Sequence, residues 1–280
     1  MHKDAVLQQA LLSDMVILGK AIFPRNVMFP PCHVLELEMG FAVESRLTVS
    51  RRSLITKSMT DIISLKTSLL QDIVYNPAYS MATECPPLWE VFKKHLSTAD
   101  CKIAVVGNGP VQKDCRQLLE ECNLIIRCNN YLEDTCKELV SRRCELHFTC
   151  LHGRIYFEKG LSHLEAWGRQ AEASFALENS ASAEIIYKEL EQKKSRILLP
   201  SISFREKLFK VDCTRGFYAL ALALQAKCAL GLTNPIRVVG FGGAGHHYDA
   251  NHCIYHNVWA EFAIFDELWQ KGTETKHLER

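Results

Sequence analysis

The stretch 102–130 constrains the fold more than any other part of the chain. An apolar, β-branched run at 103–106 ends at Gly107, a glycine turn follows, and a second apolar run begins at Leu124. Residues 111–121, between the two runs, have the spacing of a helix. A buried strand, a turn, a helix and a second buried strand make a β-α-β unit, in which the strands are parallel. The sequence therefore predicts a parallel sheet.

The same alternation continues downstream. Further strands are predicted at 145–149, 196–199 and 236–239, and a helix rich in alanine and leucine at 217–230. We therefore expect an α/β fold, with a doubly wound, mostly parallel, Rossmann-like sheet and helices on both of its faces.

The chain upstream of this alternation has a helical pattern, with helices predicted at 5–23 and 53–75. We expect residues 1–83 to form a mostly helical N-terminal extension and residues 84–280 to form the Rossmann-like domain. Polar and charged residues interrupt the stretch 5–23, so it predicts neither a membrane-spanning helix nor a secretory signal.

Charge and cysteine content exclude several classes of protein. The 33 Lys and Arg residues against 32 Asp and Glu give a net charge of +1, which provides no field for wrapping nucleic acid. The 12 cysteines include no Cys-x-x-Cys pair, so neither a zinc ribbon nor a thioredoxin-type motif is indicated. We expect reduced thiols that pack as small hydrophobic residues, with disulfides as the alternative.

Ligands of parallel sheets bind beyond the carboxyl ends of the strands, so candidate site residues follow the predicted strands. Gly107, Asn108 and Gly109 follow the first strand. They would let a phosphate approach the backbone near the N–H groups of the next helix, and the alternative is a tight turn with a capping Asn. A dinucleotide fingerprint is incomplete, because Gln112 replaces its third glycine and Asn129 stands where an acidic residue would hold the ribose. A dehydrogenase is therefore disfavoured.

A second cluster, Thr214, Arg215 and Gly216, opens the helix predicted at 217–230. A hydroxyl, a guanidinium and a glycine at a helix N-terminus form a good seat for a carboxylate or a phosphate. The alternative is an N-capping Thr beside an exposed Arg.

A third cluster follows the strand at 236–239, where a glycine-rich loop leads into a run of histidines. Histidine is the side chain best suited to proton transfer near neutral pH, and we expect His256 to point into the cleft just before a helix that contains Glu261. One alternative is that the histidines only decorate a surface loop. Another is a metal site, without zincin or finger spacing, made by His246, His252, Cys253 and His256.

These clusters, in this order, resemble the conserved motifs of sialyltransferases of glycosyltransferase family 29, with some similarity to the bacterial family 42. The segment 104–129 resembles the large motif, and 214–242 resembles the small motif. His247 with Tyr248 resembles the third motif, and His256 followed by Glu261 resembles the very-small His-x4-Glu motif. The match covers roughly 101–272 and is thin between 150 and 205. Four ordered motifs are much more specific than any one of them.

The resemblance implies a GT-A-like variant of the Rossmann-like fold and an inverting transfer of sialic acid from CMP-sialic acid to a hydroxyl of a glycan acceptor. Asn108 and Asn129 would contact the phosphate and the ribose of the donor. His256 would take the proton of the acceptor hydroxyl, and His247, with Tyr248 beside it, would stabilise the leaving phosphate.

The predicted substrate-binding set is completed by Gly107, Gly109, Thr214, Arg215, Gly216 and Glu261. The chain has no Asp-x-Asp motif, so we expect no divalent metal and no other cofactor. Family precedent is the Golgi lumen, whereas this sequence shows no anchor or signal peptide.

Two features depart from the family pattern. Arg215 stands where a small hydroxyl residue is usual, although an Arg could still pair with the carboxylate of a sugar. The cysteine pair that links the large and small motifs is not clearly placed, since Cys101 and Cys228 are both displaced. Two alternatives therefore stay open: transfer of another CMP-activated acid sugar, such as a Kdo-type donor, and a nucleotide-binding module without catalysis.

Overall fold

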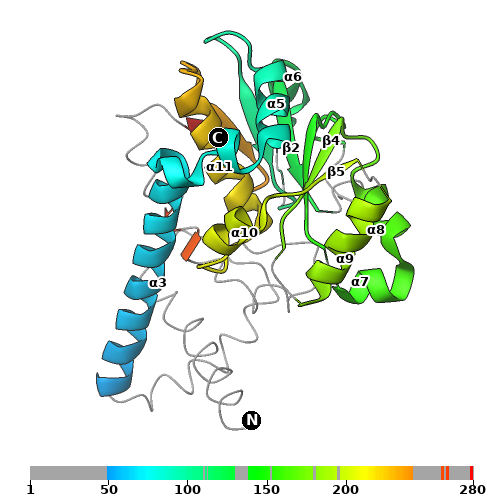
Figure 1. Cartoon of the computed structure of the whole chain (residues 1–280). Coiled ribbons are helices and arrows are strands. Elements are labelled where there is room, and N and C mark those ends of the chain that lie inside the picture. The colour runs from blue at the N-terminus through cyan, green and yellow to red at the C-terminus, as the bar shows by residue number, and fades with distance from the viewer. Residues whose placement is uncertain are drawn as a thin grey trace.

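The computed structural model describes residues 49–109, 111, 113–129, 138–151, 153–178, 181–193, 196–241, 260–261, 263–264 and 278–279. Within them lies a seven-stranded sheet in the order β5-β4-β3-β2-β1-β6-β7, and every neighbouring pair of strands is parallel (Figure 1). The strands are β1 (Ile103–Val106), β2 (Leu124–Cys128), β3 (Leu146–Thr149), β4 (Ala173–Ala176), β5 (Ile197–Leu198), β6 (Ile236–Val239) and β7 (Leu278–Glu279). The predicted parallel α/β sheet is confirmed.

Helices connect these strands. In chain order the helical segments are α3 (Val49–Tyr75), η1 (Pro77–Tyr79), α4 (Met81–Glu84), α5 (Pro86–His95), α6 (Arg116–Glu120), α7 (Gly153–Lys159), α8 (Leu161–Trp167), α9 (Ala181–Gln192), α10 (Ile202–Leu208) and α11 (Arg215–Ala229). Ala260, Glu261, Ala263 and Ile264 are also helical.

The strand order reverses at β1. From β1 the chain adds β2 to β5 on one side of it and then returns to add β6 and β7 on the other. The reversal creates a switch point between β1 and β6. In open α/β sheets, ligands bind beyond the carboxyl ends of the strands at such a point.

Both faces of the sheet are covered, and β1, at its centre, is apolar throughout. In β1, Ile103 and Val105 belong to a core that includes residues of α3, α5, α10 and α11, whereas Ala104 and Val106 pack on the other face with α6. Successive residues of a strand point to opposite faces, and burial of both produces a continuous apolar run rather than an alternating one. Helices on both faces are therefore confirmed.

Several predicted elements have other bounds in the structure, and two strands, β4 and β7, were missed. The helix predicted at 111–121 is only α6, and the helix predicted from Phe217 begins two residues earlier, at Arg215. The sequence of β4, Ala-Ser-Phe-Ala, has no β-branched residue, and β7 has only two residues, Leu278 and Glu279. The helix predicted at 5–23 lies outside the described residues.

Helix α11 is buried around almost its whole circumference. It contacts β1, β2 and β3 on one side and α3 on the other. Alternating alanine and leucine at 219–224 give the small and large side chains that such close packing needs. The helix that begins with the second candidate cluster is thereby fixed against the centre of the sheet.

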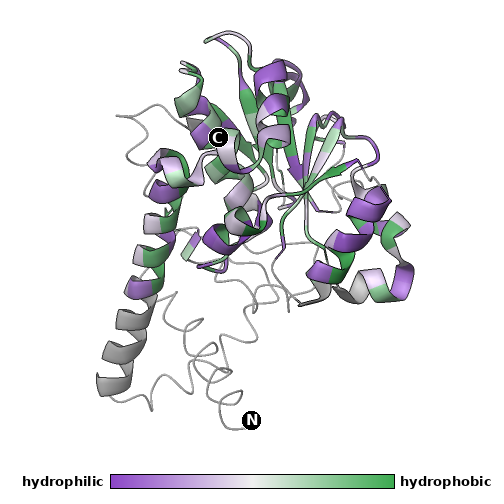
Figure 2. Ribbon diagram, in the orientation of Figure 1, coloured by the Kyte–Doolittle hydropathy of each residue, from purple (hydrophilic) through white to green (hydrophobic). Residues whose placement is uncertain are grey.

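The described part of the N-terminal extension packs into the main core. Leu69, Leu70 and Ile73 of α3 belong to the same buried cluster as the central strands. Figure 2 shows hydrophobic residues (green) along the strands and hydrophilic residues (purple) on outward turns of the surrounding helices. Among the described helices, none has both the length and the apolar character required to cross a bilayer.

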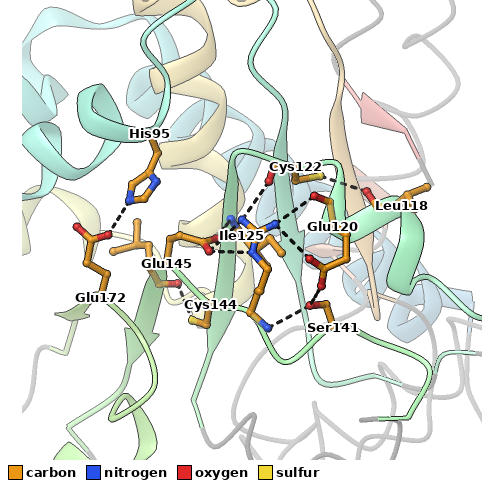
Figure 3. A network of polar contacts seen from close by, with 11 residues as sticks. His95, Leu118, Glu120, Cys122, Ile125, Ser141, Cys144, Glu145 and Glu172 are labelled. Atoms are coloured by element: carbon orange, nitrogen blue, oxygen red, sulfur yellow. Dashed lines mark hydrogen bonds and ion pairs between the residues drawn. The ribbon is translucent and has the colours of Figure 1, made fainter.

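Ion pairs gather at the amino-terminal edge of the sheet (Figure 3). Glu145, just before β3, accepts a hydrogen bond from the N–H of Ile125 in β2 at 2.8 Å. Arg143 donates to Glu145 at 3.0 Å, and Glu172, just before β4, lies 2.9 Å from the ring of His95. Charged side chains thus tie the strand starts together, at the edge opposite to the one where ligands of parallel sheets bind.

Gln225 of α11 joins α3 to α4. Its side-chain oxygen accepts from the N–H of Met81 at 2.8 Å, and its side-chain nitrogen donates to the carbonyl of Tyr79 at 2.8 Å and to that of Ile73. Ile73 lies in the last turn of α3 and Met81 is the first residue of α4, so their groups have no partner within their own helices.

We expect Gln225→Leu to lower the free energy of unfolding by about 3 kcal/mol or more, because each buried backbone group left without a partner costs roughly 1–3 kcal/mol. The matched control is Gln192→Leu, at the exposed end of α9, which should change the same quantity by less than about 0.5 kcal/mol. Urea denaturation measures both. Equal effects of the two substitutions would show that the Gln225 bonds contribute nothing.

Candidate active site

The turns after β1 and β6 meet backbone to backbone at the carboxyl edge of the sheet. The N–H of Gly107 donates to the carbonyl of Val239 at 2.8 Å, and that of Gly109 to Gly240 at 2.9 Å. A Cβ on Gly107 would lie 2.6 Å from the Gly240 oxygen, and a Cβ on Gly240 would lie 2.6 Å from the Gly107 oxygen. Gly240 also has a φ of +69°. Glycine is therefore required at both positions.

This packing corrects one part of the predicted phosphate seat. The N–H groups of Gly107 and Gly109 already bond inside the protein, and α6 begins only at Arg116. No helix N-terminus therefore follows the turn directly. The turn contributes the side chain of Asn108, whereas the N–H groups of Gly107 and Gly109 are already used.

The ring of Phe241 brings the three predicted clusters together. A Cβ on Gly107 would lie 3.0 Å from this ring, and a Cβ on Gly216 would lie 2.8 Å from it. Only with glycine at both positions can the ring fit between the turn after β1 and the first turn of α11. The first cluster, the second cluster and the start of the third are thus neighbours in space.

The two predicted asparagines lie in the same edge, at the ends of β1 and β2. Asn108 is buried and its Nδ2 donates to the carbonyl of Cys128 at 2.9 Å. Asn129 adopts a φ of +52°, a left-handed conformation that Asn tolerates better than most residues. Its Oδ1 accepts from the N–H of Cys150, just after β3, at 3.2 Å. The asparagine side chains thus link three neighbouring strand ends.

Thr214 and Glu261 bind each other inside the protein and do not face an open site. The hydroxyl of Thr214 accepts from the N–H of Phe217 as the N-cap of α11 and donates to Glu261 at 2.5 Å. The other oxygen of Glu261 accepts from the N–H of Thr214 at 2.8 Å and from Lys66 of α3 at 2.9 Å. Both carboxylate oxygens are used inside the protein, and the substrate contact expected of Glu261 stays a prediction.

Arg215 turns into the protein. It is 7% exposed, its Nη2 donates to the carboxylate of Glu178 at 2.5 Å, and its guanidinium lies 5.4 Å from the centre of the Phe209 ring. Its Nε and Nη1 are buried and have no hydrogen-bond partner among the described residues. The alternative of a capping Thr beside an exposed Arg is right for Thr214 and wrong for Arg215.

Buried thiols surround this part of the edge. Burial raises the pKa of Cys128 to about 12 and that of Cys150 to about 11, while the nearby charge of Arg215 opposes both shifts. These thiols are protonated at neutral pH and are poor nucleophiles. Every cysteine in the described part of the chain is free, including Cys101 and Cys228.

The predicted proton-transfer residues His247 and His256, and Tyr248 beside them, lie outside the described residues. The same holds for the alternative metal ligands His246, His252 and Cys253. Among the described residues, no group of three or more His, Cys, Asp and Glu side chains could hold a metal ion.

The sequence did not identify four residues that support this edge. Glu178 follows the missed strand β4, and Phe241 was taken only as part of a flexible loop. Lys66 lies far from the motifs in sequence. His147 lies in β3 and is fully buried. The signal in the sequence that could have identified it is a His within a predicted apolar strand.

No protein-family model and no curated protein sequence matches the chain. Among solved structures, the chain is similar to a mammalian sialyltransferase in complex with Gal-beta-1-3GalNAc-ortho-nitrophenol, at 13% identity and a TM-score of 0.43, over 79% of this chain and 85% of that one. It is also similar to a second crystal structure of a mammalian sialyltransferase, at 12% identity and a TM-score of 0.40, over 78% of each chain.

The contact between Gly107 and Gly240 predicts unequal costs for two alanine substitutions. Gly231, after α11, has a φ of +65° but open space around a Cβ, so Gly231→Ala should cost about 1–2 kcal/mol for the left-handed backbone alone. Gly240→Ala should cost about 1–3 kcal/mol more, because its Cβ meets a backbone oxygen. Urea denaturation of both variants measures the difference. Equal losses would contradict the close backbone contact.

Proposed function

We propose that the chain is a glycosyltransferase, and more narrowly a sialyltransferase that transfers sialic acid from CMP-sialic acid to a hydroxyl of a glycan acceptor with inversion. One observation carries the proposal. The residues of three separate sequence motifs meet at the switch point of a parallel sheet, beside a buried guanidinium with two donors that no described residue uses. A switch point is where such sheets bind nucleotides.

The nucleotide would lie on the ends of β1 and β2. Gly107 and Gly109 form the turn there, and Asn108 and Asn129 supply neutral amides of the kind that bind ribose hydroxyls and phosphate oxygens. Neither asparagine carries a charge, so the pair does not repel a phosphate. This assignment agrees with the resemblance of the segment 104–129 to the large motif.

Arg215 would bind the carboxylate of the sugar. A buried donor without a partner costs roughly 1–3 kcal/mol, and more for a charged group. An anion that accepts from Nε and Nη1 would remove that cost, and a guanidinium fits a planar carboxylate well. Thr214 and Gly216 would then act as the cap and the close contact that fix the first turn of α11 around Arg215.

The reaction would pass a proton through the histidines of the third cluster. His256 would accept the proton of the acceptor hydroxyl as the oxygen bonds to the anomeric carbon, while the bond from that carbon to the CMP phosphate breaks. His247, with Tyr248 beside it, would stabilise the charge that develops on the phosphate. Because the chain has no Asp-x-Asp motif, we propose that this transfer needs no divalent metal.

The first test is the release of CMP from CMP-sialic acid in EDTA, with a panel of galactoside acceptors. We expect release that depends on the acceptor, and His256→Ala should lower its rate about 10²–10⁴-fold, the usual contribution of a general base. His252→Ala, in the same segment, is the matched control and should retain most of the activity.

Each contrary outcome has a distinct meaning. Activity that is lost in EDTA and restored by Mn²⁺ or Mg²⁺ would overturn metal independence. No release, with CMP still bound, would favour a nucleotide-binding module without catalysis. Release from a Kdo-type CMP-sugar alone would favour the second candidate, which the buried Arg215 keeps open. Binding of NAD would favour a dehydrogenase.

A second test distinguishes binding of the sugar carboxylate from binding of the nucleotide. Arg215→Lys keeps the positive charge but removes the planar set of guanidinium N–H donors. We therefore expect the KM for CMP-sialic acid to rise about 10–100-fold, as for the loss of a charged hydrogen bond. The Kd for CMP, which has no sugar carboxylate, should stay nearly constant.

Arg205 is the matched control for Arg215→Lys. It is also a buried Arg, it pairs with Glu184 at 2.5 Å, and it stacks on an aromatic ring, but it lies in α10. Arg205→Lys should lower stability comparably and leave both constants unchanged. An equal rise in the KM for CMP-sialic acid and the Kd for CMP in Arg215→Lys would remove the carboxylate assignment.

A further inference from the structure

A row of buried polar side chains crosses one face of the sheet beneath Asn129. Arg127 in β2, His147 in β3 and Ser174 in β4 are register partners on neighbouring strands. His147 and Ser174 are 0% and 8% exposed. Polar residues at the centre of a sheet are costly unless they are hydrogen-bonded, so the contacts of this row require an explanation.

The hydrogen bonds of His147 fix its tautomer. Its Nε2 lies 2.7 Å from the backbone oxygen of Asn129, and a carbonyl can only accept, so Nε2 carries the proton. Its Nδ1 lies 3.2 Å from the hydroxyl of Ser174 and therefore accepts from it. Burial lowers the pKa of His147 to about 4, so the ring is neutral at neutral pH.

The backbone at Gly168 covers this pair closely. A Cβ on Gly168 would lie 1.9 Å from the hydroxyl oxygen of Ser174 and 2.6 Å from Nδ1 of His147. No other residue fits at this position without displacing the ring or the hydroxyl. The orientation of the His147 ring is therefore set from two sides, by Ser174 and by the backbone of residue 168.

Asn129 is held on three sides in its left-handed conformation. Its N–H donates to the carbonyl of Phe148 at 2.8 Å, its Oδ1 accepts from the N–H of Cys150 at 3.2 Å, and its carbonyl accepts from His147. The first two contacts are made with backbone groups of Phe148 and Cys150. Only the bond to the carbonyl is made by the side chain of residue 147, and it helps to hold Asn129 where its Oδ1 meets the N–H of Cys150.

We propose that His147 is a positioning residue: through its Nε2 proton it fixes the Asn129 backbone, and thereby the amide of Asn129, for contact with a bound nucleotide. The inference rests on the proposed function, in which Asn129 binds CMP. His147 does not touch the nucleotide itself. It acts from the next strand, below the edge where the nucleotide would lie.

Two substitutions of His147 separate positioning from packing. The amide nitrogen of Gln can occupy the place of Nε2 and donate to Asn129, whereas the shorter Asn reaches only the place of Nδ1, beside Ser174. Both remove the ring, so both should lower the melting temperature. We expect His147→Asn to raise the Kd for CMP about tenfold, which corresponds to the free energy of roughly one hydrogen bond. In His147→Gln the Kd should stay within about threefold of the wild-type value.

A second readout needs no ligand. The amide of Cys150 donates to the side chain of Asn129, so its hydrogen exchange reports the orientation of Asn129. We expect exchange about tenfold faster in His147→Asn and near the wild-type rate in His147→Gln. If the wild type does not bind CMP but Cys150 exchange follows this pattern, the proposed function fails while the positioning of Asn129 by His147 stands.

The result that overturns the proposal is equal behaviour of the two variants, in both CMP affinity and Cys150 exchange. If His147→Asn does not fold, Ser174→Ala takes its place, because it leaves the ring present but removes the hydroxyl that fixes the tautomer. We expect Ser174→Ala to speed Cys150 exchange about threefold. Unchanged exchange in a folded Ser174→Ala would count against the proposal as well.

Discussion

The contact between the backbones of Gly107 and Gly240 determines the shape of the candidate site. Two parallel strands that lie side by side at a switch point send their chains in opposite directions, which opens a crevice between the turns. Here the turns approach so closely that neither tolerates a Cβ. The room that remains is taken by the ring of Phe241, which also contacts Gly216 of α11. Three short motifs that lie up to 134 residues apart, from 107 to 241 in the chain, are neighbours because of this one contact.

The two edges of the sheet have different chemistry. At the amino-terminal edge, carboxylates and cations pair with one another and tie the strand starts together, as Glu145 does with Arg143. At the carboxyl edge the strand ends carry glycines, asparagines and protonated thiols, which leave most of it uncharged. Two ion pairs are exceptions among the described residues there: Arg215 with Glu178, and Lys66 with Glu261 beside Thr214. A positive group with unused donors in an otherwise neutral edge suits one anionic group of a ligand better than a polyanion.

The strands that were predicted correctly share a physical property that the missed strand β4 lacks. Runs of Ile, Val and Leu such as 103–106 indicate burial on both faces, and that signal is local. Strand β4 contains alanine, serine and phenylalanine, and its place in the sheet follows from pairing with β3 rather than from its own propensity. Glu178 was missed as a consequence, because its position beyond a strand end is visible only once that strand is known.

The motif residues themselves were found from the sequence, but their roles depend on partners that spacing does not reveal. Glu261 is the clearest case. Its place five residues after His256 matches a motif, yet in the fold its carboxylate lies 2% exposed between Thr214 and Lys66. A buried carboxylate needs all of these donors, since a buried charge that loses its partner destabilises a protein by roughly 3–5 kcal/mol. Helix α3, which carries Lys66, therefore stabilises the site although it precedes every motif in the sequence. Lys66 lies at least 40 residues before Gly107, the first residue of the motifs that form the site. Residues outside the motifs are therefore needed to hold the motif residues in place.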